Sequence, residues 1–403
     1  MLSTPITYGL KVFYRLWPPQ KPLVYSGCES VLKLADMLIA SGKKRPLLVT
    51  GKYLLKSGKL KPLIEKLHEN NCEVSIYNGS IPNPTFNQIK EGLELSISNK
   101  CDSIIAIGGG SVIDVAKVIS VASTNKRSVE KLVGILKIKE HPLPFYAAPT
   151  TSGSGSETTI AAVISDARTH KKHFFIDPKL IPIAVALDPQ LIKSLPSHMT
   201  AAVGMDALTH AIEAYISANS SQETDQHAEM AIKLIFDYLP LAVSNGEDLK
   251  AREMMAQASF QAGYAFTKSS LGYVHAISHQ ISACYNTPHG LANAILLPRV
   301  LRFNKSKCLS KYAKLEILLN GTSNVKNNEE MADNFIERID KLYKTIEIPA
   351  KLDGLDKKDF TKISKDALIE AKKSYAVPKT MKSKDVELIL HSITRGELNI
   401  SFE

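Results

Sequence analysis

The first half of this 403-residue chain alternates short apolar runs with helical patterns, and this alternation restricts its fold more than any other feature. The apolar, β-branched runs are residues 46–51, 72–79, 103–110 and 144–150. The segments with helical periodicity are residues 29–42, 60–71 and 87–97. Strands that are apolar on both faces must be covered on both faces. The pattern therefore predicts a parallel sheet with helices on each side.

The pattern changes near residue 195. Later segments carry helical periodicity with few strand signals, as in residues 200–217, 225–243 and 331–346. A chain of this length also exceeds what one compact core usually holds. We therefore expect an α/β domain of the nucleotide-binding type over residues 1–195 and an all-helical domain over residues 196–403, with a cleft between them. Parallel sheets of this kind bind ligands at the carboxyl ends of their strands.

Composition places the chain among ordinary globular proteins, since 44% of its residues are hydrophobic and 22% are charged. No apolar run is long enough to span a membrane, and the N-terminal residues lack the zones of a secretion signal. Five scattered cysteines show no CxxC spacing, which indicates reduced core thiols. These features predict a cytoplasmic protein without a membrane partner.

The net charge of +10 raises the alternative of a nucleic-acid-binding protein. The densest lysines lie in residues 351–366 and 379–385, where Asp and Glu interrupt them and no aromatic residues are interleaved at stacking intervals. A solvated helical face explains that pattern better, so we expect no nucleic-acid partner. A basic surface still favours anionic small molecules, including a nucleotide cofactor.

Two glycine-rich segments follow predicted strands. In the first, Gly108, Gly109 and Gly110 precede a helical pattern that begins at Ser111. Glycines let the backbone approach a phosphate, and free amides at a helix start favour negative charge. The second is the hydroxyl-rich segment 148–157. Either could be a simple turn or surface loop, but two such segments after successive strands favour a phosphate cradle.

Histidines and one aspartate show ligand spacing in the helical half. Asp206 and His210 are four residues apart, as are His275 and His279, and His289 follows inside a turn. Residues at this spacing share one helical face. Carboxylate and imidazole ligands suit iron or zinc. A single histidine is more often structural, but the joint placement on helices rich in small residues predicts a metal site.

At these residues the sequence resembles the iron-containing (group III) alcohol dehydrogenase family, to which lactaldehyde reductase and 1,3-propanediol dehydrogenase belong. The resemblance covers nearly the whole chain and rests on several long motifs in the same order. These motifs are residues 81–85, 108–117, 149–157, 204–215, 275–280 and 286–298.

The resemblance implies an enzyme that transfers a hydride between a small alcohol or aldehyde and NAD or NADP. It implies a ferrous ion, with zinc possible in its place, held by four side chains: Asp206, His210, His275 and His289. His279 matches a family position beside the metal, where it would relay protons.

The family pattern also implies the cofactor and substrate residues. Those matching its cofactor segments are Gly108, Gly109, Gly110, Ser111, Asp114, Thr150, Thr151, Ser154 and Lys172. Ala161 and Phe266 match positions that line the family's substrate pocket. Which alcohol or aldehyde fits that pocket does not follow from the sequence.

The chain departs from the family pattern after residues 46–50. Family members that prefer NAD typically carry an aspartate there, which holds the ribose 2′-hydroxyl. This chain has Gly51, followed by Lys52. Gly51 removes a like charge near a 2′-phosphate, and Lys52 could offer a positive partner. We therefore expect NADP to be accepted at least as readily as in aspartate-bearing relatives, with NAD use not excluded.

Three alternatives share this architecture. Dehydroquinate synthases hold their metal with a glutamate and two histidines, and the set of one aspartate and three histidines here argues against them. It also argues against the zinc-dependent glycerol dehydrogenases, which resemble this family but lack the residue corresponding to His210. A regulatory nucleotide-binding protein with a degenerate site would have lost ligands, and none is missing here.

The family resemblance and the apolar stretch 8–19, which contains Trp17, suggest a homodimer or a larger homo-oligomer.

Overall fold

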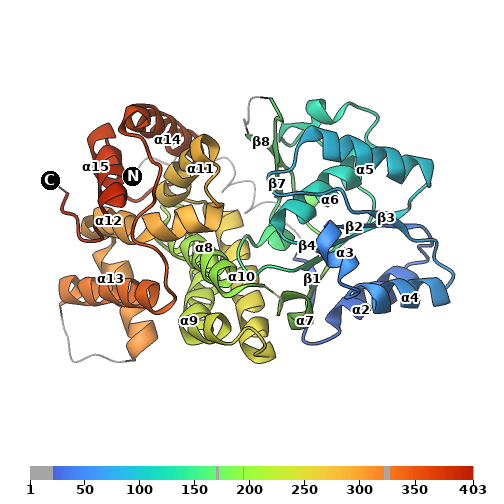
Figure 1. The fold of residues 1–403 in the computed structure, drawn as a ribbon, viewed down its shortest axis with the longest axis horizontal. Coiled ribbons are helices and arrows are strands. Elements are labelled where there is room, and N and C mark those ends of the chain that lie inside the picture. Colours follow the sequence, from blue (N-terminus) through green and yellow to red (C-terminus); the bar gives the residue numbers. More distant parts are fainter. Residues whose placement is uncertain (1–20, 169–171, 194, 322–326, 403) are drawn as a thin grey trace. The chain divides into compact units, whose positions relative to one another are not determined.

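The computed structural model describes residues 21–168, 172–193, 195–321 and 327–402 (Figure 1). They form two compact units, one within Pro19–Ser194 and one within Leu195–Glu403. The stretch 8–19 with Trp17, on which the expectation of assembly partly rests, lies outside the described residues.

The first unit is built on a six-stranded sheet in which every neighbouring pair is parallel. Its order is β1-β9-β6-β4-β2-β3. The strands are β1 (Leu23–Ser26), β2 (Pro46–Thr50), β3 (Ser75–Tyr77), β4 (Ser103–Gly108), β6 (Phe145–Pro149) and β9 (Ala184–Leu187). The predicted parallel sheet is confirmed, and the sequence missed only its two short strands β1 and β9.

Helices cover both faces of this sheet, as the continuous apolar strands require. They are α2 (Ser30–Ala40), α3 (Lys52–Lys56), α4 (Lys61–Glu69), α5 (Phe86–Ser98) and α6 (Gly110–Thr124). Alternate strand residues pack into different cores. Leu48 of β2 shares a core with α2 and α4, whereas Leu47 and Val49 share the other core with α5 and α6.

A second, three-stranded sheet has the order β5-β8-β7 and was not predicted. Its strands are β5 (Gly134–Ile135), β7 (Ala161–Ser165) and β8 (Lys172–Ile176), and β7 pairs antiparallel with β8. The remaining short elements of this unit are η1 (Val129–Leu132), η2 (Ser156–Thr158), η3 (Pro178–Leu180) and α7 (Pro189–Ile192).

The second unit is helical throughout its described residues, as predicted. Its long helices are α8 (Ser197–Ile216), α9 (Gln222–Ser244), α10 (Leu249–Ser269), α11 (Tyr273–Tyr285), α12 (His289–Asn320), α13 (Asn328–Thr345), α14 (Phe360–Ser374) and α15 (Ser383–Arg395). A short turn, η4 (Lys357–Asp359), precedes α14. Among these residues no helix is both long and apolar enough to cross a membrane.

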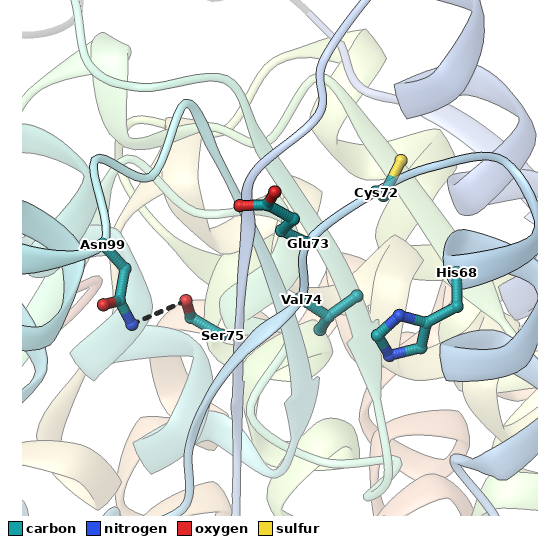
Figure 2. A pocket seen from close by; sticks show the side chains of 6 residues that line it. All are labelled: His68, Cys72, Glu73, Val74, Ser75 and Asn99. Atoms are coloured by element: carbon teal, nitrogen blue, oxygen red, sulfur yellow. Dashed lines mark hydrogen bonds between the residues drawn. The ribbon is translucent and has the colours of Figure 1, made fainter.

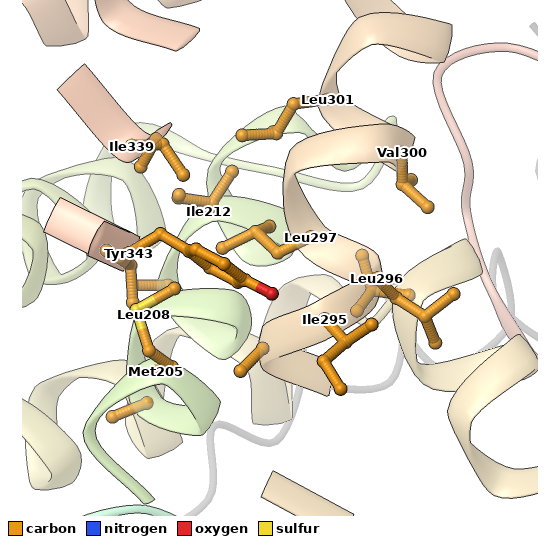
Figure 3. Packing of buried hydrophobic residues seen from close by; sticks show 14 of the residues in the cluster. Met205, Leu208, Ile212, Ile295, Leu296, Leu297, Val300, Leu301, Ile339 and Tyr343 are labelled. Carbon is orange, nitrogen blue, oxygen red and sulfur yellow. The ribbon is translucent and has the colours of Figure 1, made fainter. Parts of the chain in front are cut away.

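Helix α8 is the centre of this unit and is buried at every position from Gly204 to Ile216. Its apolar side chains pack with those of α12 and α13, and Figure 3 shows Leu208 and Ile212 near Leu297 and Tyr343. A Cβ on Gly204 would lie 2.3 Å from Cδ1 of Leu239, so glycine permits the close approach of α9. A helix enclosed in this way holds its polar side chains in fixed positions.

Candidate active site

Helix α8 places two of the predicted metal ligands in its buried interior. Asp206 and His210 are each 5% exposed and lie one turn apart. Oδ1 of Asp206 is 3.9 Å from Nε2 of His210. Burying a carboxylate and an imidazole costs free energy unless they are paired or bind a cation, so this pair indicates a site rather than packing.

Helices α11 and α12 bring two further imidazoles to the same carboxylate. Nε2 of His275 and Nε2 of His289 each lie 3.8 Å from Oδ1 of Asp206. Ligand atoms of Asp206, His210 and His275 all lie within 4.8 Å of one another. His289 is the first residue of α12 rather than part of a turn, because the helix starts directly after Pro288.

The start of α12 lies unusually close to α8. A Cβ on Gly290 would be 2.7 Å from the carbonyl oxygen of Ala202 and 3.5 Å from Cβ of Asp206. A backbone oxygen inside a helix cannot move aside as a flexible side chain can. Glycine at position 290 therefore lets His289 reach Asp206.

The pKa shifts of Asp206 and His275 suit a metal site. Burial works to raise the pKa of Asp206, but His210, His289 and His275 outweigh it and lower that pKa below its usual value. Burial lowers the pKa of His275 well below its usual value. An ionised carboxylate and neutral imidazoles are the forms that bind metals. Three nitrogens and one oxygen fit ferrous iron or zinc, so the residues present fit the implied ion.

Asn293 completes this cluster and was missed by sequence reasoning. It lies one turn after His289 and is fully buried. Its Nδ2 lies 2.6 Å from Oδ1 of Asp206 and 3.1 Å from Nε2 of both His275 and His289. The spacing of four residues from His289 was the available signal, but an asparagine is seldom a metal ligand.

His279 lies beside the cluster with its ring held by a carboxylate. Its Nδ1 is 2.6 Å from Oε1 of Glu370, which also accepts a hydrogen bond of 2.7 Å from the Tyr375 hydroxyl. An ionised carboxylate can only accept hydrogen bonds, so Nδ1 of His279 carries the proton that it donates to Glu370, and Nε2 is the acceptor. The ring stacks on His289 with centroids 5.1 Å apart.

The predicted pocket residue Phe266 also contacts this cluster, through His210. Its ring stacks on that of His210 with centroids 4.4 Å apart and planes 23° apart. Phe266 is half-buried, so its ring covers part of the ligand while staying partly accessible. Ala161, the other predicted pocket residue, lies at the start of β7 in the α/β unit and is also half-buried.

In the α/β unit, the two glycine-rich segments lie side by side. Strands β4 and β6 are neighbours in register, with Gly108 opposite Pro149. A Cβ on Gly109 would lie 3.5 Å from Thr151, and one on Gly110 would lie 2.7 Å from Oγ of Ser154. Helix α6 begins at Gly110, so its free amides face this junction. Free backbone amides this close to hydroxyl groups suit a phosphate.

The second segment is anchored by charged groups of α6. Nζ of the fully buried Lys117 donates to the carbonyl oxygens of Ser156, Thr159 and Ala161 at 2.6, 2.7 and 2.8 Å. Asp114 accepts from the Ser156 hydroxyl at 2.6 Å and from the Val163 amide at 3.0 Å. Asp114 therefore ties the loop to the helix, and Lys117 is an anchor that sequence reasoning missed.

The remaining predicted cofactor residues also belong to this unit. Gly51 follows β2 directly, and a Cβ there would meet no atom within 4 Å. Neighbouring strands β2 and β4 lead in opposite directions, to β3 and β6, which is the kind of switch point where parallel sheets bind dinucleotides. Ser111 lies in the first turn of α6, and Thr150 follows β6. Lys172 starts β8 and is half-buried.

A surface hollow of about 380 Å³ lies elsewhere in the α/β unit and holds none of the predicted site residues (Figure 2). It is lined by His68, Cys72, Glu73, Val74, Ser75 and Asn99. Most of these side chains are at least partly exposed, and Asn99 donates to Ser75 at 2.9 Å. Burial raises the pKa of the Cys72 thiol, which makes this thiol a poor nucleophile.

Known proteins share both halves of this arrangement. Residues 22–189 match the iron-containing alcohol dehydrogenases, and residues 200–394 match the C-terminal region of the Fe-containing alcohol dehydrogenase family. The chain belongs to the iron-containing alcohol dehydrogenase family. The cluster of Asp206, His210, His275 and His289 lies within the second matched region, and the glycine-rich segments lie within the first.

Individual relatives align with most of the chain. The NAD-dependent methanol dehydrogenase of Bacillus methanolicus is 35% identical over 86% of this chain and 91% of its own. Alcohol dehydrogenase 4 of Schizosaccharomyces pombe is 38% identical over 88% of this chain and 83% of its own. The crystal structure of a 1,3-propanediol oxidoreductase superimposes with a TM-score of 0.89 at 35% identity, covering 93% of this chain and 98% of the other.

The close approach at Gly290 generates a prediction for this iron-containing alcohol dehydrogenase. Gly290→Ala should weaken metal affinity by about tenfold or more, because overpacking costs about 1–3 kcal/mol and 1.4 kcal/mol is tenfold in affinity. Chelator competition on the metal-loaded protein measures this. Unchanged affinity in a folded variant would show that the start of α12 does not need to lie so close to α8.

Proposed function

We propose that this chain is an NAD(P)-dependent, iron-containing alcohol dehydrogenase that interconverts a small alcohol and its aldehyde through Asp206, His210, His275 and His289. The observation that carries the proposal is the convergence of three imidazole nitrogens on one buried carboxylate, each 3.8–3.9 Å from Oδ1 of Asp206. When bound, a divalent ion there supplies Lewis-acid stabilisation of negative charge on a substrate oxygen.

The other side chains of the helical unit bind and orient the substrate or move its proton. Phe266, stacked on His210, contributes an apolar surface beside the cluster that a small alcohol could contact. His279 accepts a proton at Nε2, because Nδ1 is committed to Glu370. Glu370 and Tyr375 keep that ring oriented.

The α/β unit holds the dinucleotide. The amides at Gly109, Gly110 and Ser111 and the hydroxyls of Thr150, Thr151 and Ser154 bind the pyrophosphate. Lys117 and Asp114 keep the second segment against α6. Lys172 and Ala161 contact the cofactor and the substrate respectively. The nicotinamide ring, when bound, supplies the hydride chemistry.

The proposed site gives His275 and His279 different roles, a metal ligand and a proton relay, and mutation can distinguish them. Chelation should abolish activity, and ferrous iron should restore it best. His275→Ala should lose metal retention, because few neighbouring groups can replace a buried ligand. His279→Ala should keep stoichiometric metal while losing about 10²–10⁴-fold in turnover, with an altered pH profile. Elemental analysis and steady-state rates across pH measure both.

Two results would contradict that assignment. A His275→Ala protein with stoichiometric metal and full turnover would remove His275 from the ligand set. A His279→Ala protein that loses metal as His275→Ala does would make His279 a ligand. Zinc in place of iron contradicts neither, because zinc binds comparable ligands more tightly than ferrous iron does.

Gly51 generates the prediction for cofactor choice. We expect NADP to be accepted at least as readily as in aspartate-bearing relatives. A Cβ at position 51 meets open space and its φ is −97°, so Gly51→Asp is sterically allowed. The new carboxylate should repel a 2′-phosphate and shift the ratio of kcat/KM values toward NAD by about tenfold or more. An unchanged ratio would show that position 51 is far from the 2′ position.

For assembly, we propose a homodimer or a larger homo-oligomer. The support is the family membership together with the apolar stretch 8–19. Light scattering at micromolar concentration should give at least twice the 44.2 kDa of one chain. A protein that stays monomeric under these conditions would refute the proposal.

We propose that the protein is cytoplasmic, because its cysteines are not paired in disulfides. All five are unpaired with one another, and Cys72, Cys101 and Cys308 are buried. Burial raises the pKa of Cys308 to about 12, which keeps that thiol protonated and unreactive. Thiol titration of freshly isolated, denatured protein should find five free thiols, whereas an intact disulfide would point to an oxidising compartment.

A further inference from the structure

Glu213 is a buried carboxylate to which the proposed reaction gives no role. It is 3% exposed and lies on α8, seven residues after Asp206 and three after His210, so all three share one helical face. A carboxylate in such a position needs partners that offset its desolvation.

Three donors from the start of α11 meet this carboxylate. Oε2 accepts from the Gly272 amide at 2.8 Å and from Nδ1 of His275 at 2.7 Å. Oε1 accepts from the Val274 amide at 2.7 Å. Glu213 thus caps the first turn of α11 and holds the imidazole that this turn carries.

Gly272 makes this contact possible. A Cβ at that position would lie 2.7 Å from Oε1 of Glu213 and 3.0 Å from its Cδ. Glycine therefore fits the carboxylate against the start of α11, and any larger residue would push it away. Glycine at position 272 is therefore the residue that this close contact requires.

We propose that Glu213 is a positioning residue for metal binding, which fixes the orientation and tautomer of His275. A proton held on Nδ1 by the carboxylate leaves Nε2 as the ligand atom, 3.8 Å from Oδ1 of Asp206. Carboxylates behind ligand histidines orient the ring, and their loss typically costs 10–100-fold in metal affinity. The inference rests on the proposed metal site.

Glu213→Gln is the sharpest test because it keeps the shape and exchanges one acceptor for a donor. If the amide oxygen takes the place of Oε2, the amide nitrogen faces the Val274 N–H. If it takes the place of Oε1, the nitrogen faces the Gly272 N–H and His275. In each orientation the amide NH₂ faces another N–H donor, so no rotamer restores all the native hydrogen bonds.

Metal affinity is measured with Co²⁺ as the probe, by its visible absorption in competition with a chelator, without cofactor or substrate. We expect a 10–100-fold loss of affinity for Glu213→Gln. Gly272→Ala should lower affinity in the same direction while leaving the charge in place. Glu316→Gln is the matched control, since Glu316 is equally buried but pairs with Arg338. Its affinity should equal that of the wild type.

The tautomer supplies a readout that loss of helix capping alone would not change. ¹⁵N-histidine spectra of the metal-free wild type should show His275 protonated at Nδ1, and Glu213→Gln should shift that proton toward Nε2. If Glu213→Gln does not fold, Glu213→Asp takes its place, because its shorter side chain should also lose the His275 contact.

Affinity within twofold of wild type in folded Glu213 and Gly272 variants, with an unchanged His275 tautomer, would overturn the inference alone. Wild-type protein that binds no Co²⁺ would overturn both this inference and the proposed function. A normal wild-type affinity that His275→Ala abolishes and Glu213→Gln leaves intact would overturn only the role of Glu213.

Discussion

The buried carboxylate of Asp206 is the charge on which the rest of the helical unit depends. A carboxylate 5% exposed is costly in an apolar interior, and here three imidazoles and the Asn293 amide surround it. The three imidazoles come from three helices, so the site forms only if the relative positions of those helices are tightly fixed. Close packing around α8 provides that, because its turns from Gly204 to Ile216 are enclosed on every side.

Small residues carry much of this arrangement. Gly204 admits α9, Gly290 admits the start of α12, and Gly272 admits the carboxylate of Glu213. In the α/β unit, Gly110 plays a comparable part by letting the backbone pass close to Ser154. In both units, glycine lets a polar group or a backbone segment reach a place that a side chain would fill.

The sequence predicts what is local and periodic. Continuous apolar strands predicted the parallel sheet, and the four-residue spacing of Asp206 and His210 predicted a shared face that the structure confirms. Strands β1 and β9, of four residues each, were missed. Glu370 could not be found, because it lies 91 residues from His279 and only packing brings them together. Glu213 lies within the motif 204–215, yet its partners Gly272 and His275 are set by the tertiary fold.

Anomalous diffraction at the iron edge, on crystals of the iron-loaded protein, tests the central claim most directly. The account predicts one peak at about 2.0–2.2 Å from an Asp206 oxygen and from Nε2 of His210, His275 and His289. A peak elsewhere in the molecule, or one that leaves out any of these four side chains, would contradict it.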